Sequence, residues 1–355
     1  MRFQWIVAAA FLIVPPATAQ GPQERTLAAD AAYRHGPTGL EIPAALPGLP
    51  PRARIAVLVP DLDEFIEYKT ADAEESVTLY IFRRATGDIP VWLDRAARQV
   101  LARDIYGGPA PLAPPAAFTP PGQSNASGLM QVFRVSKPPY RSTGVALVPL
   151  GEDWLVKLRY SSTTLAPEEL GARMQAVLGA LAWPKTIAPV PAARPIADCT
   201  TTLRAKDDAK PRGDALGSSL LQGALLGAIA KGEVKPEKTA HVATFCRDPA
   251  AHPELGNAGV YRADGERDGY LIALGDAGRG IYVSVDSLGA LLNSKDQKNY
   301  SISLYNVAQS FIFAPRDGLP KPEQALAIVK SERPTSSVTT WGGKGDVTID
   351  AKAVR

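Results

Sequence analysis

The stretch that decides the fold is "TGVALVPLGEDWLVKLRYS", residues 143–161. It contains two runs rich in apolar and β-branched residues, separated by Gly151, Glu152 and Asp153. Two such runs around a short polar stretch with a glycine are typical of a β-hairpin. The sequence therefore predicts an antiparallel pair of strands here, and the rest of the chain can be interpreted outward from it.

The second strand of this hairpin carries the first candidate site. Because successive side chains of a strand point to opposite faces, its residues separate into two sets. One set is Trp154, Val156, Leu158 and Tyr160, and the other is Leu155, Lys157 and Arg159. A half-buried strand gives this pattern with its charged set in solvent, and we favour that interpretation. The alternative is a ligand-binding face on which Lys157 and Arg159 bind a carboxylate or a phosphate.

Around the hairpin, residues 53–184 are predicted to form one α+β domain. Helical periodicity favours one helix over 91–105 and a second from about Pro167, and the proline-rich stretch 107–122 indicates a long surface loop. We expect an antiparallel sheet covered on one face. Its further strands are expected at 55–59, 76–84 and 129–135.

A second, strand-rich domain is expected over residues 199–341, after a Pro/Ala linker at 185–198 and before a tail at 342–355. One short helix is expected near 322–330. The strand candidates are 258–263, 269–275, 280–286, 300–305 and 310–315. The fold class is thus α+β, with two modules, each a mainly antiparallel sheet with one or two covering helices.

The N-terminus has the order of a secretory signal peptide. Arg2 precedes a short apolar run, and Ala17-Thr18-Ala19 supplies the small residues of a cleavage site, so residues 1–19 are predicted to be removed. Residues 20–52, rich in Pro, Gly and Ala, are expected to be an extended, disordered lead-in that contains His35. The expected location is the periplasm or the extracellular medium.

Two cysteines, Cys199 and Cys246, remain in the mature chain. In an exported protein an even pair indicates a disulfide. Closing a loop of about 47 residues would stabilise the fold by roughly 4 kcal/mol on the chain-entropy model. A zinc site built from these cysteines with His241 and His252 has poor ligand spacing, and we expect His252 in an exposed loop.

The segment "GDALGSSLLQGALLGAIAKG", residues 213–232, combines glycines and leucines without a clean apolar stripe. A mobile or partly buried helix is the favoured interpretation. The alternatives are docking of a partner protein or self-association through the small residues around Gly223 and Gly227, and, more weakly, membrane contact.

Composition excludes some classes of function. The formal charge of +3 is nearly balanced, and aromatic residues make up only 7% of the chain. The chain therefore has no large positive charge to attract polyanions, and few aromatic side chains on which bases could stack. We expect no nucleic-acid partner. We find no sequence motif for a cofactor, a metal or a catalytic triad, and none of these is expected.

Two functions remain. The first is a non-catalytic secreted or periplasmic protein that binds a partner protein, a glycan or a small ligand. The second is a periplasmic hydrolase that acts on glycans or esters through paired carboxylates. The acidic residues available in close sequence are Asp61, Asp63 and Glu64, or Asp264, Glu266 and Asp268, and both sets are expected in turns.

Overall fold

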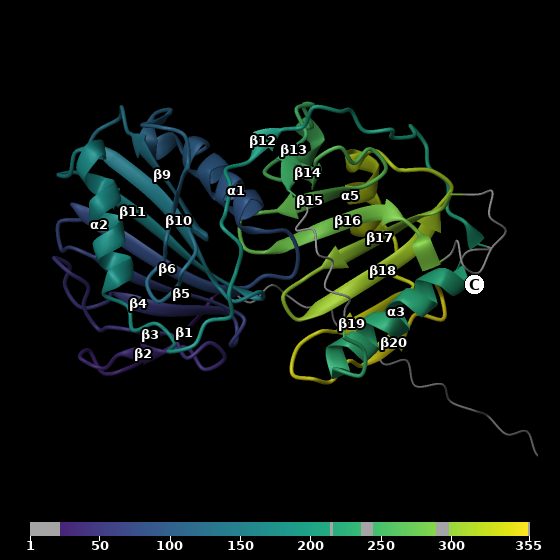
Figure 1. Cartoon of the computed structure of the whole chain (residues 1–355), viewed down its shortest axis with the longest axis horizontal. Coiled ribbons are helices and arrows are strands. Elements are labelled where there is room, and N and C mark those ends of the chain that lie inside the picture. The colour runs from purple at the N-terminus through teal and green to yellow at the C-terminus, as the bar shows by residue number, and fades with distance from the viewer. Residues whose placement is uncertain (1–21, 214–215, 236–243, 289–297, 354–355) are drawn as a thin grey trace, which may run out of the picture.

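The structure, a computed structural model, describes residues 22–213, 216–235, 244–288 and 298–353. Two large sheets stand side by side, the first built by the N-terminal half and the second by the C-terminal half (Figure 1). The described helices pack against these sheets. The α+β prediction with two mainly antiparallel sheet modules is confirmed.

The first sheet is antiparallel and follows the order β1-β4-β5-β6-β11-β10-β9-β7, with β8 also paired to β9. The predicted hairpin is β10 and β11, in which Leu150 lies opposite Trp154 and Ser142 opposite Ser162. The strands of this sheet are β1 (Gln23–Glu24), β4 (Arg54–Val59), β5 (Asp63–Lys69), β6 (Glu75–Arg83), β7 (Ala110–Pro111), β8 (Ala116–Phe118), β9 (Gly128–Arg134), β10 (Ser142–Leu150) and β11 (Trp154–Ser162).

Two helices cover opposite faces of the first sheet. Helix α1 (Ile89–Leu101) begins at Asp88, whose Oδ1 accepts a hydrogen bond from the backbone N–H of Val91. Helix α2 (Pro167–Gly179) packs in the cluster with Val156 and Tyr160, whereas α1 packs in the cluster with the neighbouring residue Leu155. The expectation of a sheet covered on one face is therefore wrong. Burial on both faces explains why every residue of β10 is buried.

The segment expected to be a disordered lead-in is part of the core. Its described residues include β1 and a two-stranded sheet of β2 (Tyr33–Arg34) and β3 (Glu41–Ile42). Leu40 and Ile42 are fully buried in the same cluster as α2. His35 is also buried, 4.9 Å from the ring centroid of Trp154, and burial lowers the pKa of His35 to about 4. Frequent prolines and glycines concealed this packing, because the buried residues do not recur with a helix or strand period.

The proline-rich stretch 107–122 runs mostly at the surface, as predicted, but it is not wholly irregular. It follows a short 3-10 helix (Asp104–Tyr106) and contributes β7 and β8 to the edge of the sheet. Edge positions tolerate proline because the missing N–H there has no ladder partner to lose.

The second sheet follows the chain order from β12 to β20, and all its pairs are antiparallel except β12 with β13. From β13 on, each strand pairs antiparallel with the one before it, and α5 lies in the connection between β18 and β19. Its strands are β12 (Ala197–Asp198), β13 (Phe245–Arg247), β14 (Gly259–Ala263), β15 (Tyr270–Leu274), β16 (Arg279–Val285), β17 (Tyr300–Tyr305), β18 (Gln309–Arg316), β19 (Ser336–Thr339) and β20 (Val347–Ile349).

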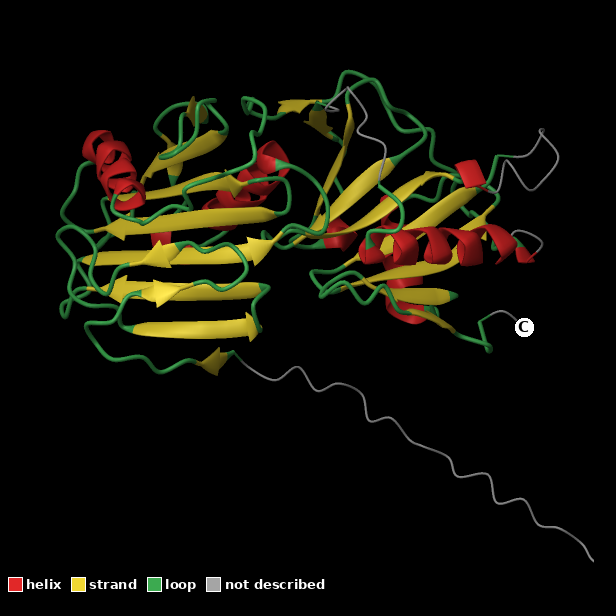
Figure 2. Cartoon of the chain, turned by 60° about the horizontal axis from the view of Figure 1, so that its bottom comes forward, coloured by secondary structure: helices red, strands yellow, loops and turns green. Residues whose placement is uncertain are grey.

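Helices also cover both faces of the second sheet. Helix α5 (Pro322–Ser331) packs in the cluster that contains Phe313. A 3-10 helix (Pro253–Leu255) from an earlier part of the chain contacts α5 on the same side of the sheet. Helix α3 (Leu216–Lys231) crosses the other face, where Gly223 lies against Ser336 and the side chain of Ile312 (Figure 2). The prediction of a helix within 213–232 is confirmed.

The two sheets share one hydrophobic cluster. Tyr261, Leu271 and Ala273 of the second sheet pack with residues of α1 and of β9 to β11. Because this contact is buried and apolar, the modules meet in a common core and not through a solvated hinge. The exact domain boundaries, including the linker at 185–198, stay a prediction. Among the described helices, none is long and apolar enough to cross a membrane.

Candidate functional site

Lys157 and Arg159 lie at the contact between the two sheets. Their side chains are only 2% and 14% exposed, and both pair with Asp276, in the turn between β15 and β16. The distances from Asp276 Oδ2 are 2.9 Å to Lys157 Nζ and 2.6 Å to Arg159 Nη2. The interpretation of this face as solvated is therefore wrong. The second sheet covers it, and a local strand pattern does not record what a distant segment will cover.

The electrostatics of this cluster follow from its burial. Burial lowers the pKa of Lys157 to about 8, against the opposing charge of Asp276. Burial alone would raise the pKa of Asp276, but Lys157 and Arg159 outweigh it and lower that pKa to about 2. The carboxylate that the two cations hold is thus the protein's own. Binding of an external anion by Lys157 and Arg159 stays a prediction.

The first acidic set does not lie together in a turn. Asp61 is exposed at the turn, whereas Asp63 and Glu64 begin β5 and are buried. Asp63 pairs with Arg279 at 2.5 Å, and Glu64 accepts hydrogen bonds from the Tyr33 hydroxyl and from Arg25. Burial raises the pKa of both carboxyls. These two acids therefore anchor the fold in the described structure, and the expectation of a solvated turn is wrong for them.

The second acidic set lies in the turn between β14 and β15, as expected. Asp264 and Glu266 are exposed and Asp268 is partly exposed. Glu266 Oε1 accepts hydrogen bonds from the backbone N–H groups of Arg267 and Asp268, which closes the turn. A carboxylate used in this way serves the local turn.

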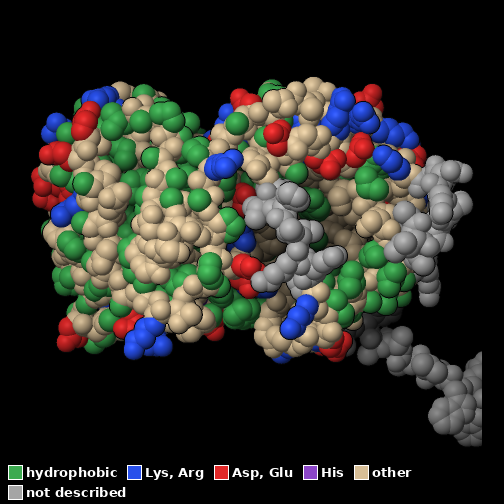
Figure 3. Space-filling view, in the orientation of Figure 1, with side chains coloured by type: hydrophobic (Ala, Val, Ile, Leu, Met, Phe, Trp, Pro, Cys, Tyr) green, Lys and Arg blue, Asp and Glu red, His purple; other side chains and the backbone are tan. Residues whose placement is uncertain are grey.

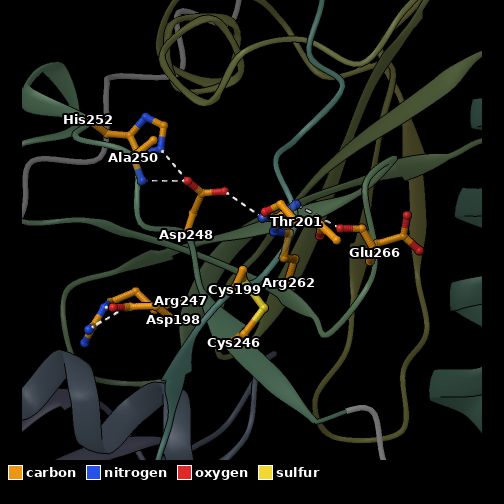
Figure 4. Close-up of a disulfide and its surroundings, with 10 residues drawn as sticks. All are labelled: Asp198, Cys199, Thr201, Cys246, Arg247, Asp248, Ala250, His252, Arg262 and Glu266. Atoms are coloured by element: carbon orange, nitrogen blue, oxygen red, sulfur yellow. Dashed lines mark hydrogen bonds and ion pairs between the residues drawn. A yellow bond between two sulfur atoms is a disulfide. The ribbon is translucent and has the colours of Figure 1, made fainter.

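The disulfide Cys199–Cys246 is present and joins the residue directly after β12 to β13, the strand with which β12 pairs in parallel. Each cysteine is followed two residues later by a polar side chain, Thr201 after Cys199 and Asp248 after Cys246. Figure 4 shows both polar residues beside the disulfide. The covalent bond therefore fixes the separation of the two segments that carry them.

A cavity of about 820 Å³ opens next to the disulfide. Its walls come from three parts of the second module: the segment that begins at Thr201, the loop 248–254, and the first turn of α5. It has the largest volume of the five cavities that we compared in the described part of the chain. We call it the His252 cavity, after the titratable ring in its wall.

His252 is held by a carboxylate. Its Nδ1 lies 2.7 Å from Glu323 Oε1, in the first turn of α5, and the ring is only 16% exposed. A carboxylate only accepts hydrogen bonds, so Nδ1 carries the proton. In the neutral ring, Nε2 is then a bare acceptor. Nε2 is buried and has no hydrogen-bond partner in the described part of the chain, and Asp248 Oδ1 lies 3.8 Å away.

Asp248 and Thr201 form the deeper wall. Asp248 Oδ1 accepts from the backbone N–H of Ala250, and Oδ2 lies 3.4 Å from Arg262 Nη2 (Figure 4). Arg262 also donates to the backbone carbonyls of Thr201 and Glu266, which ties this wall to the turn after β14. The Thr201 hydroxyl is buried and, within the described residues, unpartnered.

The cavity can therefore accept hydrogen bonds from a guest. A buried polar atom without a partner costs free energy unless a ligand or water satisfies it. His252 Nε2 and the Thr201 hydroxyl are two such atoms in one wall. The same Glu323–His252 pair can also take up a proton, as an oriented imidazole does in general-base catalysis.

Sequence reasoning missed this site. His252 was expected in an exposed loop, and that is wrong, because Glu323 is 71 residues away and covers it only in the folded chain. The local signal, a histidine before Pro253, is typical of a turn and carries no information about its partner. The helix start at Pro322 and Glu323 was recognised, but not what its carboxylate faces.

Neither metal ligation nor a known relative adds to this description. In the residues that the structure describes, no group of three His, Cys, Asp or Glu side chains is placed to hold a metal ion. The two cysteines are consumed by the disulfide, and His241 lies outside the described residues. Searches of family models, of curated proteins and of solved structures gave no match to this chain.

Proposed function

We propose that the protein is an exported, non-catalytic binding protein whose His252 cavity takes a small ligand rich in hydroxyl or amino groups, such as a glycan fragment. The observation that supports this most is the buried acceptor at His252 Nε2, oriented by Glu323. A ligand O–H or N–H would satisfy it. The size of the cavity suits one or two sugar rings.

The charges in the wall support the same class of ligand. Four carboxylates line the cavity, and two of them are paired: Asp248 with Arg262, and Asp207 with Lys321 at 2.6 Å. Glu254 and Glu323 have no ion pair with a Lys or Arg among the described residues. An excess of carboxylates disfavours anionic ligands and favours neutral or cationic ones. Amino sugars and neutral sugars therefore fit better than sugar phosphates.

Calorimetric titration of the full chain with a panel of neutral monosaccharides, disaccharides and amino sugars tests this proposal. We expect saturable binding by at least one member, and at least a tenfold weaker affinity in His252→Ala. The matched control is Glu168→Gln. It removes an exposed ion pair between Glu168 of α2 and Arg134 of β9. If no sugar binds, or if His252→Ala binds as tightly as the unchanged chain, the proposal is wrong.

A hydrolase is the second candidate, and the Glu323–His252 pair is the observation that favours it. In that case the acidic residue is Glu323, and the imidazole activates a water molecule for attack on a glycan or an ester. Turnover of chromogenic glycosides or esters that disappears in both His252→Ala and Glu323→Gln would support it. If the chain binds a sugar but turns over none of these substrates, the hydrolase is ruled out and the binding protein is supported.

Export is the part of the proposal that the N-terminal sequence supports. The apolar run and the small residues before Gln20 predict that the periplasmic or secreted protein lacks residues 1–19. Intact-mass analysis of the native protein checks this directly. A mass that still included Met1 would contradict the prediction.

A partner that docks on residues 213–232 is a further part of the proposal. The small-residue face of α3 is occupied, because Gly223 and Gly227 lie against β19, β20 and Gly345. The outer face carries Leu221 and Leu225, which are 42% and 37% exposed, in a region where hydrophobic side chains reach the surface (Figure 3). Sedimentation of the unchanged chain beside Leu221→Ser/Leu225→Ser would show whether these leucines support self-association.

A further inference from the structure

A second cavity, of about 400 Å³, lies on the other side of the loop that carries His252. It is bounded by α1 of the first module and by β12, β13 and β14 of the second. Three arginines line it, Arg95 and Arg98 from α1 and Arg247 from β13. We call it the Arg95 cavity. It shares the loop 248–252 with the His252 cavity, but its charge is of the opposite sign.

Two of the three arginines are neutralised. Arg98 Nε lies 3.0 Å from Asp94 Oδ2, and Arg247 Nη1 lies 2.8 Å from Asp94 Oδ1. Arg247 also pairs with Asp198 at 2.6 Å. Asp94 accepts one more hydrogen bond, from the Tyr261 hydroxyl at 2.5 Å. The single negative charge of Asp94 is thus already shared by two arginines, and no ion pair joins it to Arg95 among the described residues.

Arg95 is the exception. The residue is only 3% exposed, and its Nε donates to the backbone carbonyl of Gly275 at 3.0 Å. Among the residues that the structure describes, Arg95 forms no ion pair, and its Nη groups have no hydrogen-bond acceptor. Asp276, the nearby acid, is already bound by Lys157 and Arg159. Arg95 contributes to the low pKa of Asp276, but no ion pair joins the two residues in the described structure. A buried guanidinium whose Nη groups have no acceptor is costly, and an anion that accepts from them would stabilise it.

The backbone makes room for this guanidinium. A Cβ at Gly259, which also lines the cavity, would lie 2.9 Å from Arg95 Nη1 and 2.9 Å from the Tyr261 hydroxyl oxygen. A residue larger than glycine would therefore displace the Arg95 head group, the Tyr261 ring or both. The position of Arg95 depends on a specific neighbour and is not an accident of a long surface side chain.

We propose that the Arg95 cavity binds the oxyanion group of a small molecule, a carboxylate or a phosphate, through the Nη groups of Arg95 with Arg98 at its side. The charge balance supports this, because three guanidiniums face only Asp94 and Asp198, while Asp248 is paired with Arg262. The planar guanidinium suits two-point binding of such groups. The binding groups proposed here, Arg95 and Arg98, do not line the His252 cavity, and the ligand has a different charge, although the loop 248–252 lines both cavities.

The test is calorimetric titration of the full chain with inorganic phosphate and, separately, with acetate and citrate, at pH 7 and constant ionic strength with chloride as the reference anion. We expect one saturable site for at least one of these oxyanions. The comparison among them shows which oxyanion the cavity prefers. If none of them binds above chloride, the proposal is overturned.

Three variants identify the site. Arg95→Met removes the guanidinium but keeps the bulk, and we expect at least a tenfold loss of oxyanion affinity. Gly259→Ala keeps every charge but crowds Arg95 and Tyr261 in the wall of the cavity, and we expect a loss in the same direction. Arg54→Gln, which alters the exposed Arg54–Glu67 pair on the first sheet, is the matched control and should bind as the unchanged chain does.

Thermal unfolding shows whether a variant loses affinity because it no longer folds. Without an anion, Arg95→Met should melt at the same temperature or higher, because an uncompensated buried charge has been removed. With saturating oxyanion, the unchanged chain should melt higher and Arg95→Met should not respond. If Arg95→Met kept both its affinity and its thermal response, Arg95 would not be the binding group.

Discussion

Lys157, Arg159 and Asp276 connect the two sheets electrostatically at the scale of single residues. One carboxylate is shared by two cations, and the Lys157 ammonium also lies 4.3 Å from the ring centroid of Tyr80. A buried charge that loses its partner is strongly destabilising, whereas an intact cluster contributes only modest net stability. The cluster therefore determines how the modules fit together more than how tightly they are held.

Asp276 should make the protein sensitive to acid. Its folded pKa of about 2 is below the ordinary value of 3.8, so its contribution is complete above pH 4 and is lost as pH falls through 2. That difference corresponds to about 2 kcal/mol of unfolding free energy. Urea denaturation at pH 7, 4 and 2.5 should show this loss in the unchanged chain.

Two substitutions separate this effect from general acid denaturation. In Asp276→Asn the loss between pH 4 and 2.5 should be smaller by about 1 kcal/mol, because pH 2.5 is still above the folded pKa of Asp276. Stability at pH 7 should fall by about 3 kcal/mol because Lys157 and Arg159 lose their partner. Asp264→Asn, at an exposed turn position, should behave as the unchanged chain. Equal acid sensitivity in all three proteins would contradict the assignment.

The role of a single residue could be predicted from the sequence when its contacts are close to it in the chain, and not when its partner is distant. The division of β11 between two faces follows from the period of a strand, and the structure places Val156 and Leu155 in different clusters. The pairing of the two cysteines follows from their even number and the predicted export, and the disulfide is present. The partners of Lys157 and His252 could not be predicted, since Asp276 and Glu323 come from segments 119 and 71 residues away. A single sequence gives no measure of such distances in space.

At the scale of elements, α3 is the helix whose packing was hardest to foresee. Its leucines are spread around the circumference, so no apolar stripe indicated which side faces the sheet. The glycines decide this, because they allow the helix backbone to approach β19, β20 and the turn at Gly345. The sequence thus predicted the helix itself, while the choice of face depended on a close contact that only the folded chain contains.

A pair of glycine substitutions tests this account of α3. A Cβ at Gly227 would lie 2.9 Å from the backbone oxygen of Gly345, so Gly227→Ala should lower the unfolding free energy by about 1–3 kcal/mol. Gly217, in the same helix, has open space around it. There Gly→Ala should be neutral or should stabilise by up to about 1 kcal/mol through helix propensity. Equal effects of the two changes in chemical denaturation would contradict the packing.

At the scale of the whole molecule, the element order predicted two sheet modules but not their common core. Amphipathic patterns show that a face will be covered, and they do not show what covers it. Tyr261, Leu271 and Ala273 of the second sheet pack in one cluster with α1, and the Arg95 cavity lies beside that contact. The His252 cavity is formed within the second module, by segments that are far apart in the chain. The site was therefore the least predictable part, because it exists only where separately predictable units meet.

The disulfide should stabilise the whole fold. Cys199 and Cys246 are 47 residues apart, which corresponds to roughly 4 kcal/mol on the chain-entropy model. Cys199→Ser/Cys246→Ser should unfold at a lower urea concentration by about that free energy. A reductant should shift the unchanged chain in the same direction and leave the double variant unaffected. A double variant as stable as the oxidised chain would show that the bond adds nothing.

The common core also has a consequence for how the chain is made. Ribosomes release the N-terminal half first, and the residues that cover Lys157 and the outer side of α1 are synthesised more than a hundred positions later. Until then, a nascent or truncated polypeptide exposes the apolar side of α1 and the Lys157 ammonium, both of which are buried in the complete fold. Early intermediates of this kind are clients for chaperones, and fragments cut before residue 270 should aggregate where the full polypeptide does not.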